Sequence, residues 1–283
     1  ADGLALGKGV LICQNEQEAA DGVKEIMLDK KFGASGNHVV VEEFLTGPEV
    51  SVLSFCDGKT VKPMVSSMDH KRALDHDEGL NTGGMGTVAP NPYYTPAVAE
   101  RCMQEIFLPT VAAMQAEGCP FKGCLYFGLM LTPDGPKVIE YNCRFGDPET
   151  QVVLPLLESD LLTVMEATTN GTLDKTDVKF SDGAAACVIL ASGGYPLAYE
   201  KGKEITGLTA GQLDAADVTV YHAGTAIKDG RLVTNGGRVL GVTATANTLP
   251  EALKKAYAAT ESIHFDKLHK RSDIGARALA AMQ

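Results

Sequence analysis

Lys137-Val138-Ile139-Glu140-Tyr141-Asn142-Cys143-Arg144-Phe145-Gly146-Asp147-Pro148-Glu149-Thr150 is the stretch that decides the fold of this chain. The run 123–132 before it is apolar, and Pro133-Asp134-Gly135-Pro136 between the two runs is typical of a turn, so we predict a β-hairpin. Alternate side chains of a strand share a face. The two predicted faces are Val138, Glu140 and Asn142 on one side, and Ile139, Tyr141 and Cys143 on the other.

One of these faces ends in two oxygen donors, the carboxylate of Glu140 and the carboxamide of Asn142. Such a pair suits Mg²⁺, which usually takes one or two protein carboxylates and leaves its other positions to water and phosphates. Arg144, Gly146 and Asp147 follow in a proline-containing bend, which would place a cation and backbone amides beside the metal. A strand end with ordinary solvated polar residues explains the same spacing equally well.

Composition excludes several classes of protein. The net charge of −11 over 283 residues argues against broad nucleic-acid binding, which needs a basic surface. No apolar run approaches the roughly 20 residues of a membrane span, and no signal peptide is visible, so we expect no membrane partner. Seven cysteines without a CxxC pair predict reduced, mostly buried thiols and a cytoplasmic location.

A dense polar stretch lies upstream of the hairpin. Asp69-His70-Lys71-Arg72 supplies two cations, and Asn81-Thr82-Gly83-Gly84-Met85-Gly86 can form a nest of backbone amides that takes an anion. Together they predict a phosphate pocket, whereas each alone is equally typical of a solvated charge run or a flexible loop. His70 is interpreted as a positioning or structural residue rather than as a general base.

The N-terminal stretch is predicted to form a small α/β region. A glycine-rich loop with Gly7, Lys8 and Gly9 can close over a polyphosphate, although a plain turn fits it as well. We predict strands at Val10–Cys13 and Val39–Leu45 and, between them, a helix at Asn15–Lys31 that opens with a capping-box-like pair of Asn15 and Glu18.

The remaining elements alternate between helices and strands. The predicted elements are a strand at Glu49–Leu53, a turn at Asp57-Gly58-Lys59, a helix from Thr95 to Glu117 broken at Pro109, a helix at Pro148–Asn170, strands at Ala184–Ala191, Val218–His222, Arg231–Thr234 and Arg238–Ala244, and a helix at Leu249–Ile263. From about residue 181 onward short predicted strands dominate. This change predicts a separate small α+β domain that follows a linker at 171–183. Arg238 is its one candidate for touching a substrate.

Three blocks of sequence resemble the glycinamide ribonucleotide synthetase family of the ATP-grasp class: residues 69–86, 139–151 and 236–240. The resemblance extends over essentially the whole chain and includes Arg271-Ser272-Asp273-Ile274-Gly275. It implies an α+β ATP-grasp fold. Residues 1–45 would be part of the small lobe and the hinge, residues 46–175 the large lobe with the metal and substrate site, and residues 181–283 a C-terminal α+β domain. It also implies that the chain lacks an N-terminal domain and part of the small lobe.

The resemblance implies an ATP-dependent ligase that joins glycine to 5-phosphoribosylamine through a glycyl phosphate, in purine synthesis. It implies ATP and Mg²⁺ as cofactors, with Mn²⁺ as an alternative ion. The implied metal ligands are Glu140 and Asn142, and the implied catalytic residues are Arg144 and Lys71. The implied ATP-binding residues are Gly7, Lys8, Gly9, Glu42, Phe44, Leu45, Glu49 and Asn142. The implied substrate-binding residues are Asp69, His70, Lys71, Arg72, Asn81, Thr82, Gly83, Gly84, Met85, Gly86, Arg144, Gly146 and Asp147.

Two alternatives stay open from the sequence. Another ATP-grasp ligase, such as a carboxylase relative, would share the metal pair but should lack the blocks at 69–72 and 81–86. The chain may also be inactive alone, as a non-catalytic piece of a multifunctional purine-synthesis polypeptide whose other domains would be its partners. Its expected small-molecule partners are ATP, glycine and phosphoribosylamine.

Overall fold

A computed structural model of the chain describes residues 1–3, 9–208 and 217–283. The chain divides into two compact units, Ala1–Thr46 and Gly47–Gln283. Each unit is described by itself.

The first unit is built on helix α1 (Glu16–Met27), followed by a 3₁₀ turn at Gly33–Gly36. The Asn15 side chain accepts a hydrogen bond from the Glu18 amide at 2.9 Å, and the Glu18 carboxylate accepts one from the Gln14 amide at 2.8 Å. The predicted capping-box-like pair is therefore confirmed. The helix ends at Met27, four residues before the predicted end.

Two strands predicted in this unit, Val10–Cys13 and Val39–Leu45, are wrong, because both stretches are irregular. β-Branched residues favour extended backbone, but a strand is stable only when its N–H and C=O groups pair with a neighbour. Within the described part of this unit neither stretch joins a strand ladder, and Val10, Val40 and Val41 are exposed.

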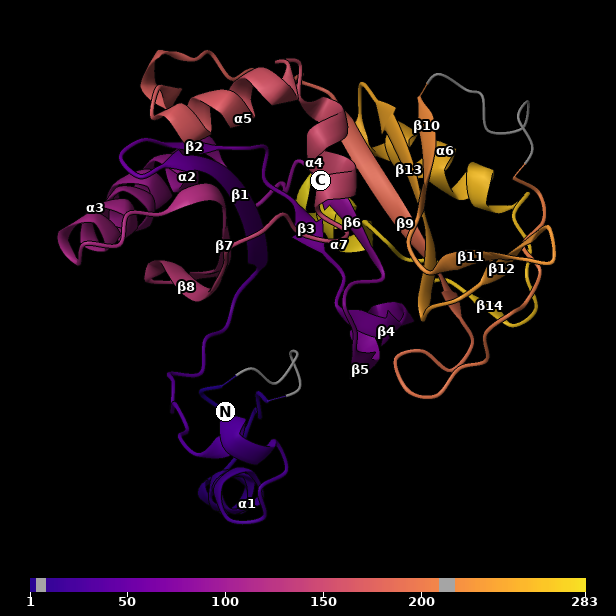
Figure 1. The fold of residues 1–283 in the computed structure, drawn as a ribbon, viewed down its shortest axis with the longest axis horizontal. Helices are drawn as coiled ribbons and strands as arrows, with labels where there is room; N and C mark the ends of the chain where they lie inside the picture. The colour runs from indigo at the N-terminus through magenta and orange to yellow at the C-terminus, as the bar shows by residue number, and fades with distance from the viewer. Residues whose placement is uncertain (4–8, 209–216) are drawn as a thin grey trace. The chain divides into compact units, whose positions relative to one another are not determined.

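The second unit begins with an antiparallel four-stranded sheet (Figure 1). Its order is β2-β1-β7-β8, with β2 at Val61–Pro63, β1 at Glu49–Asp57, β7 at Lys122–Thr132 and β8 at Gly135–Asn142. The β1–β2 turn at Asp57-Gly58-Lys59 and the β7–β8 hairpin are both confirmed. The hairpin brings the deciding stretch to the edge of this sheet.

A second sheet draws strands from both ends of the unit. Its order is β10-β13-β9-β6-β3, with β14 also pairing with β9, and the strands are β3 (Met68–Asp69), β6 (Gly86–Ala89), β9 (Ala184–Ser192), β10 (Val218–His222), β13 (Arg238–Ala246) and β14 (Leu268–His269). Two small hairpins, β4 (Arg72–Leu74) with β5 (Glu78–Asn81) and β11 (Thr225–Lys228) with β12 (Arg231–Thr234), stand beside it. The polar stretch at 69–86 therefore runs into the sheet formed by the C-terminal strands.

The helix after Thr95 is divided as predicted. It comprises α2 (Pro96–Cys102), a π-helical turn at Met103–Phe107 and α3 (Leu108–Ala116). The break lies before Pro109, which has no amide hydrogen to donate to the preceding turn. Phe107 of this segment stacks on Phe127 of β7 with ring centroids 4.1 Å apart, so these helices cover one face of the first sheet.

The single helix predicted at Pro148–Asn170 is wrong. The chain forms α4 (Thr150–Val153), a 3₁₀ turn at Leu154–Leu156 and a separate α5 (Leu161–Asn170), capped by Asp160 and ended by Gly171 in the left-handed conformation. Pro155 cannot donate a helical hydrogen bond, and Asp160 caps a new helix start. The predicted stop at Gly171 is confirmed.

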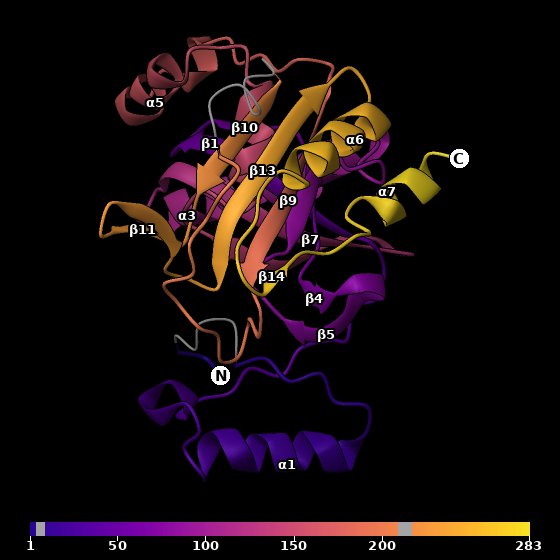
Figure 2. The same cartoon turned by 90° about the vertical axis from the view of Figure 1, so that its right-hand side faces the viewer.

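The core is layered around α4, which lies between the two sheets (Figure 1). Val152 and Val153 of α4 are fully buried against Leu53 of β1 and Ile189 of β9. Helices α6 (Leu249–Thr260) and α7 (Ala276–Ala281) cover the other face of the second sheet (Figure 2). In the described part of the chain no helix is long and apolar enough to cross a membrane.

Candidate functional site

Glu140 and Asn142 lie side by side at the end of β8, as predicted. The Asn142 amide nitrogen is 3.3 Å from Glu140 Oε1, and Arg144 Nη2 is 3.4 Å from Asn142 Oδ1. Glu140 and Arg144 are exposed. A carboxylate, a carboxamide and a guanidinium thus converge within one short stretch of backbone.

A bulge at Ile139 corrects the predicted alternation of faces. The β7–β8 register pairs Gly128 with Glu140 but Leu129 with Val138, so Ile139 is the extra residue. Val138 packs in the cluster around Phe127, on the same side as Tyr141, whose ring lies 5.6 Å from Phe127. Val138 therefore points away from the oxygen pair, where strict alternation had placed it beside that pair.

The donor set fits a hard divalent cation. Both side chains offer oxygen, and few protein ligands are needed because Mg²⁺ usually keeps waters and substrate phosphates in its shell. In agreement, the described residues contain no group of three or more His, Cys, Asp or Glu side chains arranged around one metal position. Shared coordination requires the Asn142 amide to turn over, because its nitrogen now faces Glu140.

Lys71 and Glu49, predicted for different substrates, are brought together by the fold. Lys71 Nζ lies 2.8 Å from Glu49 Oε2. Burial lowers the pKa of Lys71, but Glu49, Asp69 and Glu140 together more than offset this, so the pKa lies above its usual value. Lys71 therefore stays charged beside the Glu140–Asn142 pair.

Asp69 and Glu149 form an acidic pair that sequence reasoning missed. Glu149 is buried and accepts a hydrogen bond from the Tyr126 hydroxyl at 3.0 Å, and that hydroxyl lies 2.7 Å from Ser51 Oγ. Burial, reinforced by the charge of Glu149, raises the pKa of Asp69 well above its usual value. The only sequence signal for Glu149 was its place in the deciding stretch.

The predicted nest of free amides at 81–86 is corrected by the hydrogen bonds. The amide of Thr82 donates to Lys71 O, that of Gly83 to Tyr195 Oη, that of Gly84 to Thr82 Oγ1 and that of Met85 to His70 O, at 2.7 to 3.0 Å. These groups already have protein acceptors, so the loop has a fixed shape but does not present an open cradle. A bound phosphate would have to be held mainly by side chains.

His70 and Met85 lie in the interior. His70 is 1% exposed; its Nε2 accepts a hydrogen bond from the Gly275 amide at 3.0 Å, so Nδ1 carries the proton that is shared with Gly86 O at 3.1 Å. Burial, with Arg271 next in effect, lowers the pKa of His70 to about 4. Met85 is fully buried in the core beneath α6 and α7. Both residues support the loop from inside.

Arg238 connects two of the predicted blocks. It donates to Gly83 O at 2.7 Å and to Asp147 O at 2.8 Å. Gly146 is buried and Asp147 is exposed, while Arg72 and Asn81 face solvent on the β4–β5 hairpin. The structure thus unites the blocks at 69–72, 81–86 and 140–149.

The ATP-binding residues predicted in the first unit belong to a separate body. Gly7 and Lys8 lie outside the described residues, and Gly9 is buried. Glu42 and Phe44 are exposed and Leu45 is half-buried, all on irregular backbone.

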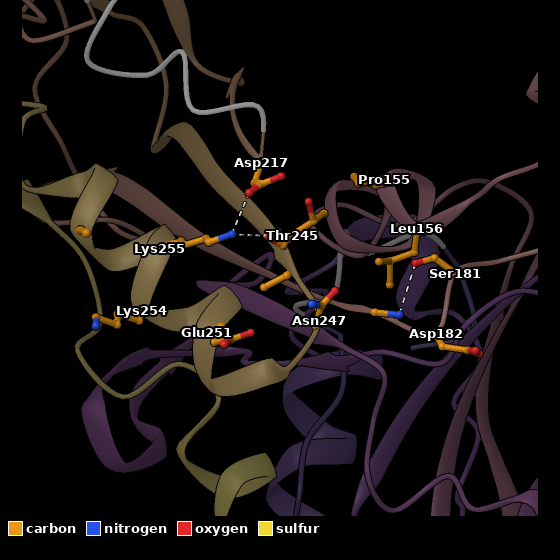
Figure 3. A pocket seen from close by; sticks show the side chains of 13 residues that line it. Pro155, Leu156, Ser181, Asp182, Asp217, Thr245, Asn247, Glu251, Lys254 and Lys255 are labelled. Atoms are coloured by element: carbon orange, nitrogen blue, oxygen red, sulfur yellow. Dashed lines mark hydrogen bonds and ion pairs between the residues drawn. The ribbon is translucent and has the colours of Figure 1, made fainter.

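A cleft of about 1010 Å³ lies away from the predicted residues, between α6, the end of β13 and the turn after α4 (Figure 3). None of the predicted site residues lines it. Its Lys255 is paired with Asp217 at 2.7 Å, so this part of the lining is close to neutral.

Comparisons with known proteins define the class. Residues 1–150 match the family model described as phosphoribosylglycinamide synthetase, ATP-grasp (A) domain, and residues 185–277 match the C domain of the same synthetase. The fold is thus of the ATP-grasp class. The chain belongs to the phosphoribosylglycinamide synthetase family.

Individual proteins of known name support this family assignment. The chain is 49% identical, over its whole length, to phosphoribosylamine–glycine ligase of Vibrio vulnificus and spans 66% of that protein. It is 51% identical over 99% of its length to the trifunctional purine biosynthetic protein adenosine-3 of Gallus gallus, of which it spans 28%. The crystal structure of phosphoribosylamine–glycine ligase from Thermotoga maritima superposes with a TM-score of 0.85 at 38% identity, covering 97% of this chain and 67% of that one.

Proposed function

We propose that the chain is the ATP-grasp and C-terminal portion of an ATP-dependent ligase that joins glycine to 5-phosphoribosylamine. The products are glycinamide ribonucleotide, ADP and phosphate. The observation that carries this proposal is the meeting of Lys71, Glu49 and the Glu140–Asn142 pair, with a fixed loop at 81–86 beside them. Relatives named phosphoribosylamine–glycine ligase support the choice of substrates.

The proposed reaction has two steps. A glycine carboxylate oxygen attacks the γ-phosphorus of ATP, and the bond from that phosphorus to the β-bridging oxygen breaks, which gives glycyl phosphate and ADP. The amine of phosphoribosylamine then attacks the acyl carbon, phosphate leaves, and the amine loses a proton. Such transfers depend on positioning and on neutralising charge rather than on a protein nucleophile.

Each proposed role follows from the chemistry of a side chain. Mg²⁺ or Mn²⁺ held by Glu140 and Asn142 would neutralise phosphate charge. Arg144, exposed beside them, and Lys71, held charged by Glu49, would orient the transferred phosphoryl group. Glu49 would accept hydrogen bonds from the ribose diol of ATP, since a carboxylate is an acceptor only.

The other proposed ATP contacts come from the first unit, where backbone groups near Phe44 and Leu45 would bind adenine, with Glu42 beside them. Gly7, Lys8 and Gly9 would cover the phosphates. For the phosphoribosyl substrate we propose the exposed or half-buried members of the predicted set: Asp69, Lys71, Arg72, Asn81, Thr82, Gly83, Arg144 and Asp147. His70 and Met85, together with the buried glycines Gly84, Gly86 and Gly146, are proposed to support this surface.

Calorimetry of MgATP binding tests the proposal. Removing both oxygen donors by Glu140→Ala with Asn142→Ala should abolish the magnesium-dependent part of binding. A matched control is Glu166→Ala with Asn170→Ala, an exposed Glu–Asn pair on α5, which should bind like the parent chain. Tight binding unaffected by the first double substitution would overturn the metal assignment.

A turnover assay tests the reaction. Repeated turnovers of ADP release should require glycine and phosphoribosylamine together. Release that proceeds without glycine, or that needs bicarbonate instead, would point to another ATP-grasp ligase. We propose that further purine-synthesis domains occur in the same polypeptide, as in the trifunctional relative. We also propose that the protein is cytoplasmic.

A further inference from the structure

Arg238 extends from the start of β13 to the loops that carry Gly83 and Asp147. Its guanidinium joins two loops far apart in sequence, because the same Nη1 donates to Gly83 O at 2.7 Å and to Asp147 O at 2.8 Å. Its Nη2 also lies 3.4 Å from Asp147 Oδ2. The side chain is 20% exposed, so these charge-assisted hydrogen bonds are partly screened from water.

Tyr195 makes a second connection to the same loop. Its hydroxyl accepts the Gly83 amide hydrogen at 3.0 Å, so the amide of Gly83 is held by Tyr195, in the turn after β9, and the carbonyl of Gly83 is held by Arg238 of β13. A Cβ on Gly237 would lie 2.2 Å from the Tyr195 ring, so only glycine lets that ring come so close. A register shift between Arg238 and Leu240 in the β13–β9 pairing accompanies this arrangement.

This geometry explains why the sequence reads Gly236-Gly237-Arg238. Gly237 leaves room for the Tyr195 ring. The register shift lies at the start of β13, and Arg238 extends from there to both loops. The ion pair of Arg238 with the exposed Asp147 carboxylate is worth little by itself. The backbone carbonyls of Gly83 and Asp147 are the main partners of Arg238. These hydrogen bonds therefore fix the two loops independently of the side chains that the loops carry.

We propose that Arg238, assisted by Tyr195, is a positioning residue that holds the 81–86 loop and the 144–149 loop at a fixed separation. Asp69 and Lys71 beside one loop and Arg144 on the other can then face the same phosphoribosyl substrate. This inference rests on the proposed function, but its loop-holding part does not. It replaces the expectation that Arg238 itself touches substrate.

The test compares four variants of this chain by hydrogen exchange and by calorimetry: Arg238→Met, Arg238→Lys, Tyr195→Phe and Arg231→Met. Arg238→Met removes the cation but keeps much of its bulk. Tyr195→Phe removes one hydroxyl and is expected to fold. Arg231→Met is the matched control, because Arg231 is an exposed arginine of the second unit whose guanidinium pairs with Glu204 and does not contact either loop in the described part of the chain. The probes are ribose 5-phosphate and MgATP.

Arg238→Met should speed amide exchange in both loops and weaken ribose 5-phosphate binding by roughly 10- to 100-fold, while MgATP affinity stays within about twofold. Tyr195→Phe should speed exchange at Gly83 and leave the 144–149 loop unchanged. Arg238→Lys, which can reach one carbonyl but not both, should recover part of the loss. Arg231→Met should change none of these.

Unchanged exchange in both loops of Arg238→Met would overturn the proposal. So would faster exchange across the whole second unit with equal losses for both ligands, because that result indicates a general structural role. If the loops loosen as expected but the parent chain does not bind ribose 5-phosphate, the substrate assignment fails while the loop-holding role of Arg238 is supported.

Discussion

The buried ring of His70 leads us to expect that the free energy of unfolding falls in acid. Its ring is 1% exposed and must stay neutral, because Nε2 accepts the Gly275 amide hydrogen while Nδ1–H points at Gly86 O. Protonation would place a second hydrogen against the Gly275 amide, near the cations Arg271 and Arg277. Burial is the main reason that the pKa falls to about 4, and Asp77 only partly opposes this shift.

The sign and size follow from linkage. A histidine with a pKa of about 6.5 when unfolded and about 4 when folded binds more protons in the unfolded state between these values. Its contribution is therefore complete above pH 6.5 and is lost as the pH falls toward 4. Since one pKa unit corresponds to about 1.4 kcal/mol, the loss between pH 8 and pH 4 is about 3 kcal/mol.

The assay is urea unfolding at several pH values between 8 and 4. The parent chain is compared with His70→Gln, whose amide oxygen can accept from Gly275 but does not titrate. His222→Gln is the control, because the exposed ring of His222 makes a hydrogen bond with Thr225 at 3.0 Å and is not buried on folding as His70 is. The parent and the control should lose about 3 kcal/mol more than His70→Gln over this range.

Equal pH slopes for the parent chain and His70→Gln would refute the reasoning. That result would mean that His70 titrates normally, so that its ring is reached by water or its neighbours relax on protonation. A lower stability of His70→Gln at pH 8 alone would not matter, because the prediction concerns the slope.

Two further predictions concern other buried groups. Arg271→Met should cost about 3–5 kcal/mol in urea unfolding, because Arg271 is 1% exposed and pairs with Asp77 at 3.0 Å and with Asp273 at 2.7 Å; a loss below about 1 kcal/mol would contradict this. The exposed Cys119 and Cys143 should react quickly with a thiol reagent at pH 8, whereas Cys124 and Cys187, whose pKa burial raises to about 12, should react only in urea, and rapid labelling of the native Cys187 would refute that burial.

The elements that the sequence predicted well are those with a local cause. The strands Val218–His222 and Arg231–Thr234 have the predicted bounds, with Gly224 shortly after the first and Gly230 and Gly236 on either side of the second. The break before Pro109 likewise has a local cause, the missing amide hydrogen. Family resemblance, carried by the blocks at 69–86 and 140–150, gave the fold class that the comparisons confirm.

The helix predicted at Pro148–Asn170 failed for local reasons, Pro155 and Asp160, but the other failed elements depend on partners distant in sequence. The stretches Val10–Cys13 and Val39–Leu45 have strand-like composition, but composition alone does not provide a neighbouring strand with which they could pair. The bulge at Ile139 depends on the pairing with β7, and one extra residue was enough to turn Val138 to the other face. The amides at 82–85 could not be known to be occupied, since two of their acceptors are the Tyr195 hydroxyl and His70 O.

The loop at 69–86 is shaped by residues about two hundred positions away. Arg271 donates to Arg72 O, His269 Nε2 lies 2.7 Å from Ala73 O, and the Gly275 amide donates to His70. Each contact fixes backbone or a buried ring and leaves the side chains of Lys71 and Asn81 free to face outward. A short polar loop alone would sample many shapes, and ordering it costs about 1–2 kcal/mol per residue. These contacts from residues 269–275 offset part of that cost, so the end of the chain stabilises the shape of the loop at 69–86.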